Sequence, residues 1–246
     1  MVKLNGHWGL IDNKGEEVVS PKYDEISDFV DGIARVKLHN WDFDFIDKNG
    51  NNITPKQHYG SLYSDALDFS NGFAAVKNKN SLWGYIDKSG NEVIKCQFEE
   101  AMSFSEGLAC IKLGDNYGYI NNKGDIVIYC CYPEAGDFKN GFALVSYVPK
   151  INGKMHRNLI NTDDDTYTLN YQPPTKKKYI NANGESLIIR SVVDIYQTNF
   201  EAEKDILQSI DKITYLIDDA TDFYEGYARV KIKGVWRLLD TKGRFY

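Results

Sequence analysis

The histidines are the first candidates for catalysis or metal binding, and their spacing supports neither. The chain contains no HExxH motif, GxSxG elbow, Walker loop or GxGxxG motif. The four histidines are scattered along the sequence: His7, His39, His58 and His156. We therefore expect structural or exposed histidines, with no catalytic residue, no cofactor and no metal, although residues far apart in sequence can still converge in space.

The four cysteines are too few and too poorly spaced for a disulfide framework or a zinc site. They form no CxxC pair, and one pair is adjacent: Cys96, Cys110, Cys130 and Cys131. Neighbouring residues of a strand point to opposite faces, which makes Cys130 and Cys131 awkward chelators. We expect reduced thiols that serve as small apolar side chains.

Two sets of polar residues, each recurring at the same position of successive repeats and here called columns, could be mistaken for functional sites. Carboxylates and amides precede a glycine by three residues at Asp12, Asp47, Asp87, Asn121, Asn181 and Asp240. Asp and Asn cap turn backbones, so turn capping explains this column without catalysis or calcium. Lysines form the second column at Lys37, Lys77, Lys112 and Lys231, and solvated lysines protect strand edges from unwanted pairing.

Two charge clusters fall where the regular pattern is broken, and they are the candidate partner-binding residues. The clusters are Asp163, Asp164, Asp165 and Lys176, Lys177, Lys178. The acidic triplet lacks the spaced ligands and glycine of an EF-hand loop. An elongated hairpin with a solvated tip also accounts for both clusters.

The elements that position these residues are internal repeats. One phrase occurs six times, as WGLIDNKG, WDFDFIDKNG, WGYIDKSG, YGYINNKG, KYINANG and VWRLLDTKG. Its final glycine lies at positions 15, 50, 90, 124, 184 and 243, separated by 35, 40, 34, 60 and 59 residues. A second phrase alternates with it, as FVDGIARVK, FSNGFAAVK, FSEGLACIK, FKNGFALVS and FYEGYARVK. Such periods indicate stacked supersecondary units.

Each phrase has the alternation of a strand. Trp83, Tyr85 and Asp87 share one face and Ile86 takes the other, before a short turn that ends in glycine. In the second phrase, Ala and Val alternate with outward residues. A third stretch, seen as EEVVSPKYDEI, NEVIKCQFEEA and DIVIYCCYPEA, predicts one bent strand or two short ones. We expect three- or four-stranded antiparallel meanders, in which Trp8, Trp41 and Trp83 are buried between adjacent units.

These phrases resemble the WG-repeat family of bacterial proteins, also called KWG repeats. The residues that carry the resemblance are Trp8, Gly9, Trp83, Gly84, Tyr117 and Gly118, each pair followed by an apolar-Ile-Asp/Asn-x-x-Gly turn. The glycine is lost at Trp41-Asp42, Lys178-Tyr179 and Trp236-Arg237. The resemblance implies a repeat architecture in a bacterial protein and carries no general biochemical activity.

The expected fold is one all-β domain over residues 1–246. Regular repeats occupy 5–147, insertions lie at about 148–176 and 190–217, and a final repeat covers 218–246. Apolar residues at helical spacing after Thr198 predict one inserted helix within about 198–217. Both chain ends carry the first phrase, which favours an open twisted β-array; a closed β-propeller is the alternative.

Composition narrows the possible partners. The net charge is −6 and the pI is about 5.3, which argues against nucleic acid or an anionic membrane. No apolar stretch is long enough to span a bilayer, and the first repeat begins too early for a signal peptide. We expect a soluble, cytoplasmic, non-enzymatic repeat module that binds a protein or peptide. A carbohydrate- or cell-envelope-binding module is the alternative, and a hydrolase is less well supported.

Overall fold

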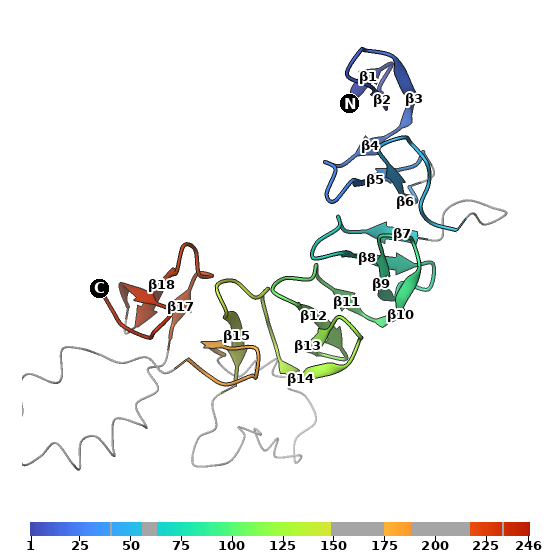
Figure 1. Cartoon of the computed structure of the whole chain (residues 1–246). Helices are drawn as coiled ribbons and strands as arrows, with labels where there is room; N and C mark the ends of the chain where they lie inside the picture. The colour runs from blue at the N-terminus through green and yellow to red at the C-terminus, as the bar shows by residue number, and fades with distance from the viewer. Residues whose placement is uncertain (40, 56–62, 149–174, 188–216, 233) are drawn as a thin grey trace, which may run out of the picture. The chain divides into compact units, whose positions relative to one another are not determined.

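The computed structural model describes residues 1–39, 41–55, 63–148, 175–187, 217–232 and 234–246. These residues form antiparallel strands and no helix, and within each sheet neighbouring strands are consecutive in the chain (Figure 1). The chain divides into two compact units, Met1–Cys130 and Cys131–Tyr246. None of the described residues lies in a helix that is long and apolar enough to cross a membrane.

The strands group into six repeats that match the six copies of the first phrase. Repeats 1 to 3 contain β1 (Val2–Leu4), β2 (His7–Ile11) and β3 (Glu17–Tyr23); β4 (Glu25–Ile26), β5 (Ile33–Lys37) and β6 (Phe43–Asp47); β7 (Tyr63–Ala66), β8 (Phe73–Asn78), β9 (Trp83–Asp87) and β10 (Glu92–Phe98). Repeats 4 to 6 contain β11 (Glu100–Ala101), β12 (Leu108–Leu113), β13 (Asn116–Asn121) and β14 (Ile126–Tyr132); β15 (Ala143–Tyr147) and β16 (Lys176–Ile180); β17 (Asp219–Ala220), β18 (Tyr227–Ile232) and β19 (Val235–Asp240).

Each first phrase ends in a turn capped by its carboxylate or amide, as predicted. In repeat 3, Asp87 Oδ1 accepts hydrogen bonds from the backbone N–H groups of Ser89 and Asn91, both at 2.9 Å. Gly90 then takes a φ of +77°, which favours glycine. Burial opposes ionisation of Asp87, but the hydrogen bonds from Asn91 and Ser89 outweigh it and lower the pKa of this carboxyl.

The strand that follows the first phrase in repeats 1, 3 and 4 is here called the outer strand (β3, β10 and β14). The glycine of the Trp-Gly pair is needed because this outer strand passes directly over it. A Cβ at Gly84 would lie 2.5 Å from the carbonyl oxygen of Ile94 and 2.6 Å from the backbone nitrogen of Cys96. Gly9 and Gly118 meet the same obstacle under β3 and β14. The β2–β3 and β9–β10 pairings also carry register shifts, so the outer strand is bulged where it crosses.

The repeats that lack this glycine also lack the outer strand among their described residues. The register places Asp44, Lys178 and Arg237 in the glycine position, since each lies opposite the Val of the second phrase or its equivalent. In repeat 2, Phe43 pairs directly with Tyr63 of β7, which joins repeats 2 and 3 into one seven-stranded sheet. The predicted departures Trp41-Asp42 and Lys178-Tyr179 were therefore misaligned, by two residues and by one.

Within each compact unit, the hydrophobic core lies between consecutive repeats rather than inside each one. One cluster joins Leu10, Val19 and Tyr23 of repeat 1 to Ala34, Val36 and Ile46 of repeat 2. Corresponding clusters join repeat 2 to 3, repeat 3 to 4 and repeat 5 to 6. A single meander has too little apolar surface to fold alone, so stacking supplies the stability.

The irregular segments lie largely outside the described residues. The segment of the predicted helix lies outside the described residues except for Ile217, which forms a β-bridge with Lys177 and is 1% exposed. The helix therefore does not extend to Ile217, because this residue takes the sheet position that Tyr63 takes in repeat 3. The insertion at 148–176 connects β15 to β16, whose first pair is Tyr147 and Lys176, and residues 149–174 lie outside the described part of the chain.

Candidate interaction surface

Each repeat has two faces with different roles. We define the leading face by the Ala and Val of the second phrase and the Ile of the first, which in repeat 3 are Ala74, Val76 and Ile86. These three residues are fully buried against repeat 2. The trailing face carries the alternate residues, including Ala75 and Tyr85, and packs against the next repeat.

A phenylalanine from the following repeat anchors the trailing faces of repeats 2, 3 and 5. Phe69 packs edge-on against Phe45 with ring centroids 5.2 Å apart, and Phe104 packs against Tyr85 at 4.8 Å. In the second compact unit, Phe223 packs against Tyr179, also at 4.8 Å. Such aromatic pairs contribute about 0.5–1.5 kcal/mol beyond the buried area.

The tyrosines of the trailing face also use their hydroxyl groups. Tyr85 donates to the backbone oxygen of Met102 at 2.8 Å, and Tyr179 donates to that of Thr221. Burial, with a smaller effect from Asp222 and then Asp219, raises the pKa of Tyr179, which keeps the hydroxyl protonated as a donor.

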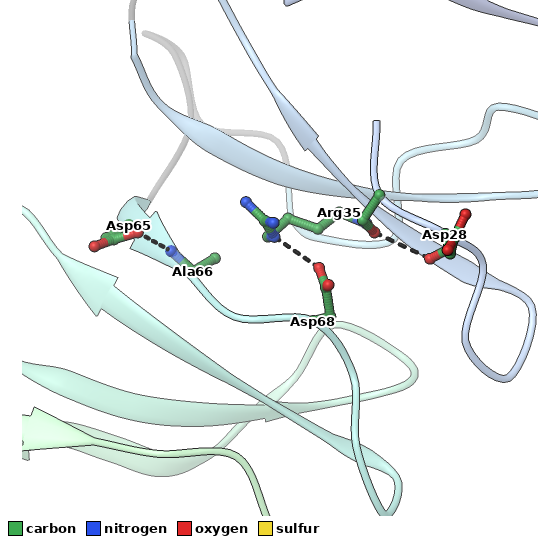
Figure 2. Close-up of polar contacts among 6 residues, drawn as sticks. Asp28, Arg35, Asp65, Ala66 and Asp68 are labelled. Atoms are coloured by element: carbon green, nitrogen blue, oxygen red, sulfur yellow. Dashed lines mark hydrogen bonds and ion pairs between the residues drawn. The ribbon is translucent and has the colours of Figure 1, made fainter. Parts of the chain in front are cut away.

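An ion pair accompanies the phenylalanine at two interfaces. Figure 2 shows the Arg35 guanidinium of repeat 2 reaching Asp68, which directly precedes Phe69; Nε and Oδ1 are 2.8 Å apart. Lys139 of repeat 5 reaches Asp222, which directly precedes Phe223, at 2.7 Å. The cation belongs to the earlier repeat in both cases, so an acidic residue followed by Phe is a recurring element of the interface.

On the trailing face of repeat 6, three large side chains are exposed among the described residues. Leu238 occupies the position of Phe45, Tyr85 and Tyr179 and is 39% exposed, whereas those three residues are 0–1% exposed. Two neighbours on this face are exposed as well, Tyr227 at 44% and Trp236 at 42%. We call this surface the terminal face and define it by Tyr227, Arg229, Lys231, Trp236 and Leu238, which share one side of β18–β19 by register.

The terminal face combines apolar and cationic groups. Arg229 occupies the position of Arg35, and its guanidinium lies 5.0 Å from the Trp236 ring centroid, as the Arg35 guanidinium lies 5.2 Å from that of Phe43. Among the described residues, no carboxylate forms an ion pair with Arg229. The face therefore offers an exposed indole and an aliphatic side chain beside Arg229, and the register also places Asp219 opposite Lys231 and Asp240 opposite Tyr227 on this side.

The other repeat tryptophans differ in exposure. Trp83 is buried, as predicted, at 9% exposure, and Trp8 is partly buried with Lys3 stacked 5.3 Å from its ring. The prediction for Trp41 was wrong, since this side chain is 74% exposed in a turn with a φ of +68°. Phe43 takes the tryptophan position in repeat 2 instead, and Tyr117 takes it in repeat 4.

The predicted basic cluster Lys176–Lys178 lies within β16 and makes internal contacts. Lys176 pairs with Asp218 at 2.9 Å and Lys177 with Asp219 at 2.8 Å. Lys178 lies 5.5 and 5.2 Å from the ring centroids of two tyrosines, and burial lowers its pKa. The three ammonium groups thus have roles within the second compact unit. Asp163, Asp164 and Asp165 lie outside the described residues.

Two of the four lysines in the column pair with acidic residues across the strands. Lys37 contacts Glu25 at 3.1 Å, and Lys112 contacts Glu100 at 2.9 Å. The described residues show no cluster of three or more His, Cys, Asp or Glu side chains arranged to hold a metal ion. The four cysteines have no disulfide partner in the structure; Cys110 is buried and Cys131 is exposed.

The exposed side chains of repeat 6 are not apparent from the sequence, although one signal is present. Aligning the six first phrases by their final glycine shows Leu238 where Tyr or Phe stands in four copies. The alignment does not indicate exposure, however, because Leu10 occupies the same position in repeat 1 and is 5% exposed. Identifying the face required knowing which side of each sheet meets the next repeat.

The chain belongs to the WG containing repeat family. The family model matches residues 8–40, 45–82, 83–117, 117–147 and 213–236, which together make up more than half of the sequence. Among curated proteins, none matches the sequence significantly.

Several solved structures resemble the fold at a low level. The computationally designed Ika8 protein has a TM-score of 0.45 and 12% identity, covering 94% of this chain and 64% of its own. The WD40 β-propeller domain of Doa1 has a TM-score of 0.36 and 10% identity, covering 91% and 67%. BamB from Moraxella catarrhalis has a TM-score of 0.38 and 11% identity, covering 89% and 61%. The chain spans less than two thirds of Ika8 and of BamB, and similarities of this size do not distinguish an open array from a closed propeller.

Proposed function

We propose that the chain is a non-enzymatic repeat module that binds a protein or peptide partner. The observation that supports this proposal is a group of exposed side chains on repeat 6, where Tyr227, Trp236 and Leu238 are 44%, 42% and 39% exposed beside Arg229. Exposed aromatic and aliphatic side chains beside an arginine are the composition of a protein-binding hot spot. The proposal includes a cytoplasmic location and a bacterial source, and cell fractionation tests the location.

The insertions remain part of this proposal. Regular repeats must keep their geometry in order to stack, whereas inserted segments can acquire new side chains without disturbing the core. We therefore predict that residues 148–217 contribute to partner binding. Since β16 begins at Lys176 and its lysines make internal contacts, this contribution is assigned to the segments outside β16.

The experiment replaces residues 150–174 by a short Gly-Ser turn, which keeps β15 and β16 intact. The tagged parent and the variant are used to capture partners from a bacterial lysate, and captured proteins are quantified by mass spectrometry. We expect the variant to lose a partner that the parent captures while its melting transition stays cooperative. Tyr129→Ala is the matched control, because Tyr129 is 79% exposed in the regular repeats. Undiminished capture by the 150–174 variant would place binding elsewhere.

Carbohydrate or cell-envelope binding is the second candidate, and exposed rings favour it. Trp41 is 74% exposed and Tyr224 is 77% exposed, and flat rings of this kind can stack on sugars. Affinity electrophoresis in gels containing cell-wall glycans tests this candidate. Retardation of the parent that is lost in Trp41→Ala would support it over protein binding. A hydrolase is the least supported class, and turnover of fluorogenic ester, peptide and glycoside substrates tests it.

A further inference from the structure

We propose that Asp137 is a pH-sensitive switch at the contact between repeats 5 and 6, which becomes tighter when the carboxyl group of Asp137 takes up a proton. This inference goes beyond the proposed function and does not depend on it. It rests on three charged side chains that all belong to the second compact unit: Asp137, Lys139 and Asp222.

One oxygen of the Asp137 carboxyl group is buried without a hydrogen-bond partner. Among the buried side-chain nitrogen and oxygen atoms of the described residues, only Asp137 Oδ1 and His7 Nδ1 lack such a partner. His7 Nδ1 still lies 3.3 Å from a carboxylate oxygen of Asp24, whereas no ion pair between described residues involves Asp137. A carboxylate oxygen that loses its hydration and receives no donor in return disfavours the ionised form of the group.

The carboxyl group of Asp222 brings a second negative charge close to Asp137. Asp222 Oδ1 lies 3.6 Å from the place that a Cβ on Gly136 would occupy, directly beside Asp137 in the chain. Asp222 Oδ2 accepts a hydrogen bond from Lys139 Nζ at 2.7 Å. The cluster thus holds two carboxyl groups and one ammonium group, and the ammonium group is bound to Asp222. When both carboxyl groups are ionised, one negative charge has no counter-ion within the cluster.

These surroundings raise the pKa of Asp137. Burial is the largest cause, Lys139 opposes it, and the charge of Asp222 adds to it. A pKa that is raised in the folded state means that the protonated carboxyl group stabilises the fold relative to the ionised one. This stabilisation is fully present below the unfolded pKa of about 3.9, and it is lost as the pH rises through the folded pKa.

The cluster spans the contact between two repeats. Asp137 and Lys139 belong to repeat 5, whereas Asp222 directly precedes Phe223 of repeat 6, whose ring packs against Tyr179 of repeat 5 at 4.8 Å. The repulsion between the two carboxylates therefore acts across this contact. Protonation of Asp137 removes the repulsion and leaves the Lys139–Asp222 ion pair in place, so the two repeats are held together more firmly.

The contact between repeats 2 and 3 does not share this arrangement. It has Asp28 and Asp68 at the positions of Asp137 and Asp222, but its cation is Arg35, which lies on a strand rather than in the turn. Neither of its two carboxyl groups has a buried oxygen without a partner. The switch is therefore a property of this pair of repeats rather than of the repeated phrase.

The direct test follows the carboxyl carbon of Asp137 by nuclear magnetic resonance as the pH of the full-length protein is varied. We expect a titration midpoint above about 3.9, the value for an unperturbed aspartate. Asp222→Asn should lower this midpoint, because it removes the like charge and releases Lys139. Lys139→Gln should raise the midpoint, because it removes the only cation of the cluster. Opposite shifts in these two variants distinguish the charge cluster from burial alone.

Urea melts at about pH 7 and about pH 4.5 test the effect on stability. Asp137→Asn, which is neutral at both pH values, should be more stable than the parent at pH 7, and its advantage should shrink at pH 4.5. Asp219→Asn is the matched control from the same contact, because its hydrogen bond with Lys177 lowers the pKa of Asp219. This control should be less stable than the parent at pH 7, so the two variants differ in sign.

Amide exchange locates the effect at the contact. The N–H of Lys177 in repeat 5 donates to the backbone oxygen of Ile217 at 3.3 Å, so its exchange reports opening between the repeats. After correction for the intrinsic effect of pH, this exchange should slow several-fold between pH 7 and pH 4.5 in the parent, relative to Asp137→Asn.

Three results would overturn the inference. The first is a midpoint for Asp137 at or below about 3.9. The second is a midpoint that rises in Asp222→Asn. The third is a stability difference between the parent and Asp137→Asn that does not change with pH. If Asp137→Asn does not fold, the titrations of the parent, Asp222→Asn and Lys139→Gln still decide the question.

Discussion

The glycine of the Trp-Gly pair allows the sharpest test of how the repeats are built, through Gly84→Ala. The new Cβ would lie 2.5 Å from the Ile94 oxygen and 2.8 Å from the Cys96 Cα, both backbone atoms of β10. Real Cβ atoms do not approach backbone this closely, so β10 must move away from β9. The substitution adds one methyl group and changes neither charge nor the turn.

The cost of moving β10 follows from what it buries. Ile94 and Phe98 are each 3% exposed, and full burial of such a side chain contributes about 1.5–3 kcal/mol. Detachment of the strand would then cost about 3–6 kcal/mol, whereas a small shift that keeps both side chains buried costs about 1–3 kcal/mol. We expect a loss of about 3 kcal/mol, since the clash lies at the bulge, where β10 has little freedom to slide.

The assay combines urea unfolding, followed by tryptophan fluorescence, with hydrogen exchange of the β10 amides. Gly107→Ala is the control. Gly107 has a φ of +84°, and a Cβ added to it would meet no atom within 4 Å, so only backbone strain of about 1–2 kcal/mol is expected. Equal losses in the two variants, or unchanged protection of β10 in Gly84→Ala, would show that the close approach does not determine the residue.

Other positions test the burial of the tryptophans, the ion pair between repeats and the capped turn. In urea melts, Trp83→Ala should lower the free energy of unfolding by about 3–5 kcal/mol and Trp41→Ala by less than about 0.5 kcal/mol, because only Trp83 is buried. Equal losses would contradict the register that places Phe43 in the tryptophan position. The Arg35–Asp68 ion pair should contribute at most about 1 kcal/mol in a double-mutant cycle, since the side chains are 23% and 48% exposed; a larger coupling would mean that the pair is desolvated. The lowered pKa of Asp87 means that its ionised form stabilises the fold above the unfolded pKa of about 3.9 and that this contribution is lost as the pH falls through the folded pKa. The stability difference between the parent and Asp87→Asn, measured by urea melts from about pH 7 to about pH 2.5, should therefore shrink below about pH 4, and a constant difference would contradict the assignment.

The local structure was predictable from sequence because short-range rules determine it. Period-two alternation placed Trp83 and Tyr85 on one face, and the Asp-x-x-Gly turn was explained by side-chain capping before any contact was known. The third stretch was recognised in three copies. The end of this stretch also occurs at the start of repeats 3 and 6, where Tyr63 and Ile217 take the position of Phe98. The residues that precede Tyr63 and Ile217 do not have the sequence pattern of an outer strand, so these two copies were not recognised.

The errors arose where position depends on pairing between strands. Trp41 was placed in the tryptophan column because it is the only tryptophan near that phrase, but the hairpin register puts Phe43 opposite Lys37. Counting back from Gly50 would have given the same answer, since Trp83 precedes Gly90 by seven residues and Phe43 precedes Gly50 by seven. The exposure of Leu238 could not be predicted in this way, because it depends on what packs against repeat 6 and not on repeat 6 itself.

The glycine substitutions and the insertions have a common physical cause. Where glycine is kept, the chain after the turn must lie close over the sheet as a bulged strand, and its length is then constrained. Asp44 and Lys178 prevent that path, because any Cβ there would collide with the strand backbone. The first residues after the turn still pair with their own sheet, since Ile53 donates to the Phe45 backbone oxygen at 3.0 Å and Leu187 donates to that of Tyr179 at 2.8 Å. Tyr63 and Ile217 then take the outer sheet position at the next repeat. Extra residues cost little at such places, and the chain is longer there: 40 residues separate Gly50 from Gly90, and 59 separate Gly184 from Gly243, against 34 or 35 in the regular repeats. Loss of the glycine therefore coincides with the longer spacing after repeats 2 and 5, whereas the insertion at 148–176 lies between β15 and β16, ahead of Lys178, and needs a separate explanation.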